Sequence, residues 1–250
     1  MKTIATIAAL FIAITTYAQE GLKEGYKILG GSFSFNVSES EDDAIGYYTD
    51  YNQNRFNSFN FSPYYGRFYA DNQLIGLKFG VNTGSSEYSS EELIDNSDQI
   101  DRTSLQENNS TQLSLGIFWR YYLPISEKIG FLVEPALNGF WEKRKNLMRY
   151  ERYRELSYEQ NEIDEYETIS KGYGVRLYLN AGFYYFPLPQ LSLEVLLGNF
   201  VTDFTFGKTS SKDLENLELQ HERNYSRFNI NFKAANSFRF DELIRLNYYF

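Results

Sequence analysis

The sequence predicts an all-β fold: an antiparallel, up-and-down transmembrane β-barrel of eight strands. Three observations lead to it. Apolar and polar residues alternate along many segments, short and long connections alternate between those segments, and aromatic residues are abundant. The 250-residue chain combines a mean hydropathy of −0.47 with 18% aromatic residues. A barrel has such a composition because every strand alternates lipid-facing and lumen-facing residues.

The overall composition excludes several other classes of protein. The 33 acidic residues outnumber the 24 Lys and Arg residues, which argues against a nucleic-acid partner. Cysteine is absent, so disulfides, thiol nucleophiles and Cys-ligated metal sites are excluded. Beyond the N-terminus, no apolar run approaches the roughly 18 residues of a membrane-spanning helix.

The first eighteen residues have the pattern of a cleaved secretory signal peptide. Lys2 precedes the apolar run Ile4–Ile14, and small residues stand three and one positions before the expected cleavage site after Ala18. The run is too short for a transmembrane anchor, the alternative that it suggests. We expect residues 1–18 to be removed and residues 19–250 to form one exported barrel domain.

Segments of period two follow one another along this domain. In Ile75–Asn82, for example, apolar side chains occupy one face, and glycine, lysine and asparagine occupy the other. The phase slips near Gly198, which predicts a β-bulge. The predicted strands are Leu29–Val37, Phe59–Tyr69, Ile75–Asn82, Gln112–Leu123, Ile129–Trp141, Tyr173–Tyr185, Leu191–Leu197 and a final segment within Asn224–Phe250.

The connections between these strands alternate strictly in length. The short ones are Asp71-Asn72, Pro124–Lys128 and Pro187–Gln190, and the long, charged ones are Ser38–Arg55, Gly84–Asn109, Lys143–Ile169 and Gly207–Arg223. Outer-membrane barrels have short periplasmic turns and long extracellular loops. Seven connections imply eight strands, and the longest loop could hold a charged helix.

The final segment is longer than a spanning strand requires. Asn224–Phe250 far exceeds the roughly ten residues that cross a bilayer in a β-strand. The sequence leaves open whether one strand extends above the membrane or a break lies between Ala234 and Glu242. A ninth, tenth or re-entrant strand is a further alternative.

Small residues on the polar face suit a narrow lumen, and apolar and aromatic residues on the other face suit lipid. A soluble β protein with an aromatic core is the alternative. Charges assigned to the lumen should pair into a plug, whereas Arg120 and Arg176 could instead line a narrow pore or a small-ligand site. The lumenal charges by phase are Lys78, Arg120, Glu134, Arg176, Glu194, Lys233 and Arg245.

The chain ends with an alternating strand whose apolar positions Leu246, Tyr248 and Phe250 are typical of the insertion signal read by barrel-assembly machinery. The segment Phe59–Gly80 resembles the second and third strands of the eight-stranded OmpA/OmpX-like outer-membrane barrels, and Phe118–Tyr122 resembles the fourth. The resemblance covers about residues 25–250. It implies a barrel in the Gram-negative outer membrane, and it leaves the activity open because such barrels include adhesins, structural proteins, secretion accessories and a few enzymes.

The sequence gives little support for catalysis. The single histidine, His221, could act only with loop residues such as Ser210, Ser211 and Asp213, which occur in any polar loop. The acidic loops Ser38–Asp50 and Glu87–Glu107 lack EF-hand spacing. We therefore expect no enzyme activity, cofactor or metal.

One basic run follows directly on Trp141, at the height expected for lipid phosphates. It predicts contact with lipopolysaccharide through Lys143, Arg144, Lys145, Arg149, Arg152 and Arg154. The leading expectation is a structural or surface-interaction protein of the envelope, with a closed or nearly closed lumen and long extracellular loops. It would meet an extracellular or envelope protein partner through these loops. The alternatives are an accessory of a secretion or assembly machine and a narrow channel or small-ligand transporter.

Overall fold

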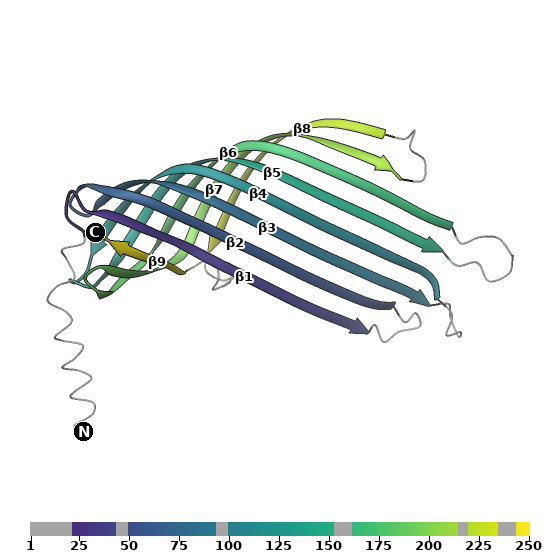
Figure 1. Cartoon of the computed structure of the whole chain (residues 1–250), viewed down its shortest axis with the longest axis horizontal. Coiled ribbons are helices and arrows are strands. Elements are labelled where there is room, and N and C mark those ends of the chain that lie inside the picture. Colours follow the sequence, from purple (N-terminus) through teal and green to yellow (C-terminus); the bar gives the residue numbers. More distant parts are fainter. Residues whose placement is uncertain (1–21, 44–49, 94–99, 153–161, 215–219, 235–243) are drawn as a thin grey trace, which may run out of the picture.

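A computed structural model describes residues 22–43, 50–93, 100–152, 162–214, 220–234 and 244–250. The predicted signal peptide lies outside these residues. Nine strands are present in the described part of the chain (Figure 1). Their bounds are β1 Lys27–Asp43, β2 Asp50–Ala70, β3 Gln73–Leu93, β4 Ile100–Pro124, β5 Ile129–Arg152, β6 Glu162–Leu188, β7 Leu191–Asp213, β8 Gln220–Ala234 and β9 Ile244–Tyr249.

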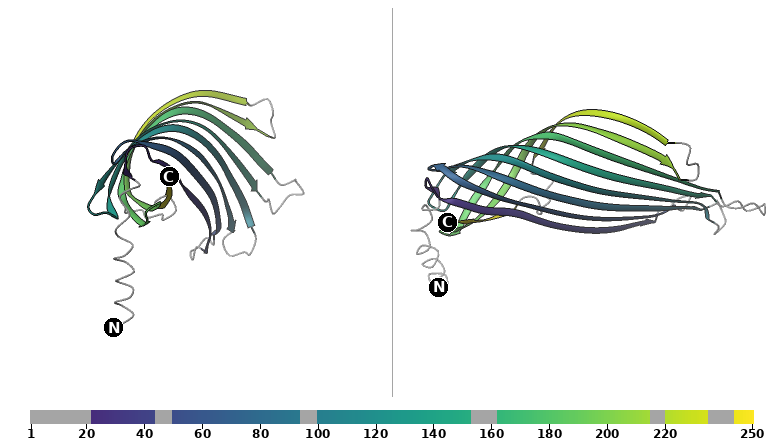
Figure 2. Two further views of the ribbon diagram at one scale, coloured as in Figure 1. Left: turned by 60° about the vertical axis from the view of Figure 1, so that its left-hand side comes forward. Right: turned by 45° about the horizontal axis from the view of Figure 1, so that its top comes forward.

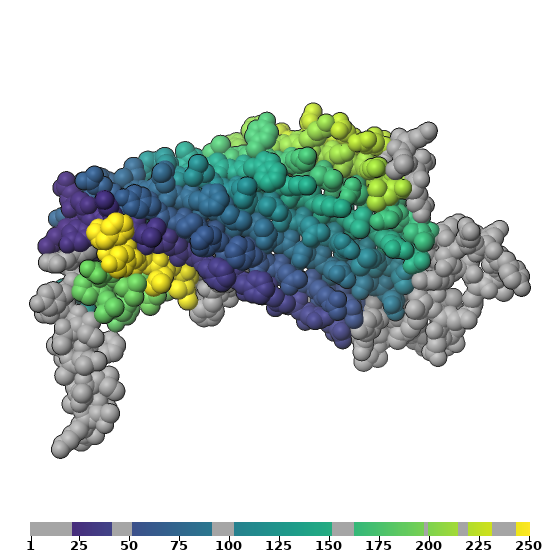
Figure 3. Space-filling view, viewed as in Figure 1, coloured from purple at the N-terminus to yellow at the C-terminus, as the bar shows by residue number. Residues whose placement is uncertain are grey.

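The strands form one antiparallel sheet that closes into a ring of eight. From β1 to β7 each strand pairs with the next, β7 pairs with β9, and β9 pairs with β1. In the space-filling view β9 lies between β1 and the first residues of β7 (Figure 3). The predicted antiparallel barrel is therefore confirmed. None of the helices in the described part of the chain is long and apolar enough to cross a membrane.

The eighth position of the ring is shared by two strands. The first residues of β7, Leu191–Val195, pair with β9, and its later residues pair with β8. Of the alternatives for the final segment, the structure shows two separate strands: β8 ends at Ala234 and β9 begins at Ile244, and residues 235–243 lie outside the described part of the chain. Within the described residues β1 pairs with β9 only over Ile28–Gly31, and its other edge pairs with β2 throughout.

The ring is closed at the end with the short turns, and the sheet spreads into a curved trough away from it (Figure 2). The predicted short turns are confirmed, since β2 ends at Ala70 just before β3 begins at Gln73, and the other two short connections lie where expected. Asn72 has φ of 61°, a left-handed conformation that asparagine tolerates better than most residues.

Most of each predicted long loop is strand instead. β3 and β4 continue as a ladder up to Leu93 and Ile100, far into the predicted loop Gly84–Asn109. The described part of the loop Lys143–Ile169 holds no charged helix, since β5 runs to Arg152 and β6 begins at Glu162, and residues 153–161 lie outside the described residues. The alternation of apolar and polar residues does not reveal these strand ends, because both of their faces are polar. Hydroxyl pairs such as Ser90–Ser104, 2.6 Å between oxygens, join neighbouring strands in place of apolar contacts.

The predicted bulge lies in β7. Gly182 pairs with Leu196, but Ala181 pairs with Gly198, so Leu197 is an extra residue. The bulge reverses the phase of the strand: Glu194 is buried in the lumen before it, and Asp203, an odd-numbered residue, is buried after it.

The outer face of the ring is apolar. Leu, Ile, Val and Phe side chains alternate outward along every strand of the ring and are largely exposed, as Phe33 and Leu115 illustrate at 64% each. Tyr65, Tyr69 and Tyr121 are exposed near the short turns, and Trp141 lies toward the opposite end. Exposed apolar surface of this extent requires an apolar environment.

Candidate functional site

Four charged side chains from four strands meet inside the ring. Arg120 of β4, Glu134 of β5, Glu194 of β7 and Arg245 of β9 are all nearly inaccessible to solvent. Strand alternation places each of them on the lumenal face, and the register sets Glu194 directly opposite Arg245. Two cations and two anions therefore occupy one cross-section of the lumen.

The four groups form a continuous ion-paired network. Arg120 Nε donates to Glu134 Oε2 over 2.7 Å, Arg120 Nη2 donates to the same oxygen, and its Nη1 donates to Glu194 Oε1 over 2.7 Å. Arg245 Nη1 donates to Glu134 Oε2 over 2.8 Å. The formal charges cancel, as buried charges require if their desolvation is to be offset.

Hydroxyl groups fill the remaining hydrogen-bond capacity of Glu194. The Tyr122 hydroxyl donates to Glu194 Oε1 over 2.9 Å and lies 3.1 Å from the Tyr249 hydroxyl, which contacts Ser192 at 2.9 Å. This chain links β4, β7 and β9. Buried networks with each member satisfied hold their strands in one arrangement.

Aromatic and amide groups enclose the other side of the network. The Arg120 guanidinium lies 4.8 Å from the centre of the Tyr64 ring, and the Tyr64 hydroxyl donates to Asn247. Asn180 donates to Glu134 Oε1 over 3.1 Å. A cation over a desolvated aromatic face gains electrostatic energy as well as packing.

A layer of buried apolar side chains lies in the lumen between the network and the short turns. Phe68 stacks on Tyr122 at 5.7 Å between ring centres, and Phe186 packs against Tyr249 at 5.0 Å. Leu22, which is also buried, covers this end, and its carbonyl accepts a bond from the Asn72 amide over 2.7 Å. We call this layer together with the ion-paired network the lumenal plug.

The other predicted lumenal charges make no ion pair with these four groups. Among the described residues Lys78 has no carboxylate within 4.0 Å, but it lies close enough to all four charges of the network to interact with them electrostatically. Arg176 lies 4.5 Å from the centre of the Phe140 ring and donates to the Tyr178 hydroxyl over 3.1 Å. The side chain of Lys233 is not described. Sequence analysis missed the tyrosines of the plug, although Tyr122 and Tyr249 share the phase of its charges.

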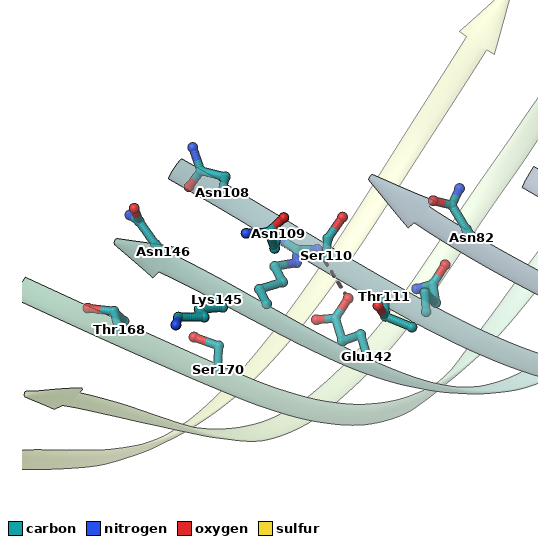
Figure 4. A pocket seen from close by; sticks show the side chains of 12 residues that line it. Asn82, Asn108, Asn109, Ser110, Thr111, Glu142, Lys145, Asn146, Thr168 and Ser170 are labelled. Carbon is teal, nitrogen blue, oxygen red and sulfur yellow. Dashed lines mark hydrogen bonds and ion pairs between the residues drawn. The ribbon is translucent and has the colours of Figure 1, made fainter. Parts of the chain in front are cut away.

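Beyond the plug the lumen opens into a polar hollow of about 490 Å³ (Figure 4). Its lining is mostly amides and hydroxyls, such as Asn82, Thr168 and Ser170. Glu142 is buried there and accepts a bond from Arg144 over 3.1 Å. In the described residues no three His, Cys, Asp or Glu side chains are placed to share a metal ion.

The strands divide the predicted basic run between two faces. Arg144 and Lys145 both line the hollow (Figure 4), whereas Lys143 is exposed and shares the outward phase of Trp141 on β5. Arg149 is exposed. The side chain of Arg152 is not described, and Arg154 lies outside the described residues.

His221 is in β8, not in a loop, and pairs with Ser211 across the sheet. It is exposed, as expected for a solvated histidine. Ser210 pairs instead with Glu222, and Asp213 ends β7.

The C-terminal residues face outward. Leu246, Tyr248 and Phe250 are each about half exposed, and β9 pairs with the start of β1. Lys27 and Phe250 exchange two backbone hydrogen bonds, of 2.8 and 3.0 Å. The last strand therefore closes onto the first, and the role of these residues as an insertion signal stays a prediction.

Comparison with known proteins gives similarity of fold only. No protein-family model and no curated protein matches the chain. The structure of the outer membrane protein OprG from Pseudomonas aeruginosa is 13% identical with a TM-score of 0.41, over 93% of this chain and 99% of that one. A major outer membrane protein from Thermus thermophilus is 12% identical with a TM-score of 0.28, over 90% of this chain and 98% of that one. These scores are low, so the fold rests on the strand pairing itself.

Proposed function

We propose that this chain is an integral outer-membrane β-barrel with a closed lumen and a structural or surface-interaction role in the envelope. The observation that carries the proposal is the lumenal plug. An ion-paired network of Arg120, Glu134, Glu194 and Arg245 fills the ring, and an apolar layer backs it. A lumen filled in this way leaves no path for ions or solutes.

The membrane location is supported by the outer face. Apolar side chains are exposed all around the ring, while charged residues are gathered inside it or toward its two ends. This distribution is the inverse of a soluble barrel and suits lipid. The polar ends of β2 to β7 would then project beyond the bilayer on the extracellular side.

The role in surface interaction is supported by these projecting ends. They are built as paired strands, so they present side chains in a fixed arrangement to a partner at low entropic cost. Exposed tyrosines such as Tyr88 and Tyr166 stand there, and tyrosine is enriched in protein interfaces. We propose no enzyme activity and no cofactor for this arrangement.

Reconstitution into planar lipid bilayers tests the closed lumen. We expect silent bilayers from protein whose folding is verified by circular dichroism and by a heat-dependent shift in gel mobility. Steady single-channel currents would show that the protein is instead a narrow channel. A stable complex recovered from cross-linked envelopes would favour the accessory role in a secretion or assembly machine.

A further inference from the structure

Three aromatic residues form a row across the outer face of β5, β6 and β7. Trp141 pairs with Tyr173, and Tyr173 pairs with Phe206. All three are exposed, Tyr173 by 65%. Trp and Tyr gather at the boundary between lipid tails and headgroups, so this row marks the extracellular boundary of the apolar band.

Three lysines form the next row on the same face. Each lies two residues from an aromatic residue, away from the short turns: Lys143 pairs with Lys171, and Lys171 pairs with Lys208. Two residues along a strand amount to about 7 Å. We call Lys143, Lys171 and Lys208 the lysine row. It lies at the depth of lipid headgroups if the aromatic row marks the boundary.

The lysine row has an excess of positive charge. Like charges on directly opposite residues of neighbouring strands are destabilising. Lys208 pairs with Glu222 at 2.6 Å, and the nearby Lys145 pairs with Glu167 at 2.6 Å. No described carboxylate lies within 4.0 Å of the ammonium group of Lys143 or Lys171. The charges of the lumenal network are paired, whereas Lys143 and Lys171 have no ion-pair partner among the described residues.

We propose that the lysine row binds the phosphate groups of the phosphorylated glycolipid that forms the outer leaflet. The proposal rests on insertion of the barrel in the outer membrane. The sequence predicts this contact through one contiguous basic run, whereas the lysine row takes one residue from each of three strands. Arg144 of the run lines the hollow instead, and Lys171 and Lys208 come from elsewhere in the sequence. The aromatic row would lie against the lipid chains below the phosphates.

The test compares two forms of lipid A, bisphosphorylated and dephosphorylated, binding to the folded barrel in detergent micelles. We expect the wild-type protein to prefer the bisphosphorylated form by about tenfold or more, because each lysine near an anionic surface contributes favourably. The triple variant Lys143→Gln, Lys171→Gln, Lys208→Gln should lose this preference. Equal binding of the two lipids to the wild-type protein, or an unchanged preference in the variant, would overturn the proposal.

A matched control separates a local site from net charge. The triple variant Lys23→Gln, Lys27→Gln, Arg67→Gln removes the same charge from exposed residues at the opposite end and should keep the wild-type preference. Loss of the preference in this control would count against a local site. Inorganic phosphate at millimolar concentration should compete weakly, and binding of phosphate as tight as that of lipid A would show that the ligand is the free anion.

Insertion is measured separately, by the heat-dependent shift in gel mobility of each protein in lipid vesicles. If the wild-type protein fails to insert, the proposed function fails. If it inserts but does not distinguish the two forms of lipid A, only the lysine row is wrong. A triple variant that fails to fold is replaced by the pair Lys143→Gln, Lys171→Gln, which leaves the Lys208–Glu222 pair intact.

Discussion

Arg245 and Glu134 connect strands that lie on different sides of the ring. The Arg245 guanidinium of β9 donates to the Glu134 carboxylate of β5 over 2.8 Å, and both side chains are almost fully buried. Glu134 also accepts from Arg120 of β4, so one carboxylate serves two cations. These charges therefore brace the lumen across its width.

Glu134→Gln should destabilise the barrel strongly. The substitution keeps the shape of the side chain but leaves two buried guanidinium groups with one carboxylate, and breaking a buried pair in this way costs about 3–5 kcal/mol. Urea unfolding in lipid vesicles, followed by tryptophan fluorescence, measures the change. The matched control is Glu39→Gln, which removes an exposed partner of Arg55 and should change the stability far less, because exposed ion pairs contribute little. Similar losses in the two variants would contradict a buried network.

Gly76→Ala should destabilise the barrel by overpacking the lumen. A Cβ atom at Gly76 would lie 2.6 Å from the Phe118 ring and still closer to the Tyr65 carbonyl oxygen, so the expected cost is about 1–3 kcal/mol. The same unfolding assay applies. In Gly139→Ala the nearest atom to the new Cβ is 3.9 Å away, so this control should unfold like the wild type. Equal effects would mean that the lumen is looser than the structure shows.

Deleting Phe250 should slow assembly in cells several-fold. The deletion removes the two backbone hydrogen bonds with Lys27 and the terminal aromatic residue that the assembly machinery is expected to read. The rate of assembly is measured as the fraction of pulse-labelled protein that acquires the heat-dependent gel mobility of the folded barrel over time. Truncation of an outward-facing side chain in the same strand serves as the control: Ile244→Ala should assemble normally. Unchanged assembly after the deletion would argue against an insertion signal.

Amide hydrogens of Ser85–Ser90 should exchange slowly with deuterium. The sequence predicts a loop there, but the structure pairs these residues with β2 on one side and β4 on the other. Paired backbone amides are protected from exchange until the ladder opens. Exchange measured by mass spectrometry in micelles should be slower there than at Glu127 in the short turn between β4 and β5. Exchange of Ser85–Ser90 as fast as in that turn would mean that these residues form a loop, as the sequence predicts.

The sequence reveals those parts of the fold in which two faces differ chemically. Lipid and lumen impose opposite demands, so strands such as Ile75–Asn82 and the bulge at Leu197 can be located from phase alone. The projecting ends of the strands meet water on both faces. Gly84–Asn109 therefore lacks alternation, and its sequence resembles that of a loop.

The lumenal site could be predicted only as a set of inward charges. The phase of a residue in a strand tells on which face its side chain lies. The height of that side chain in the lumen and the residues that it contacts depend on strand register and on the curvature of the ring. Arg120 and Arg176 have the same phase, yet Arg120 lies in the network and Arg176 packs on Phe140. The aromatic members of the plug were missed because tyrosine suits both the lumen and a membrane girdle.

The division of the eighth position between β8 and β9 leaves the ring with two short seams, one on each side of β9. Every residue of β1 from Lys27 to Asp43 has a partner in β2, but among the described residues only Ile28–Gly31 have a partner in β9. The backbone hydrogen bonds between two paired strands share an applied force, so the strand pairs with the fewest such bonds separate first. Under mechanical pulling the barrel would therefore rupture at the edges of β9, and strands β1 to β8 would peel away as one curved sheet.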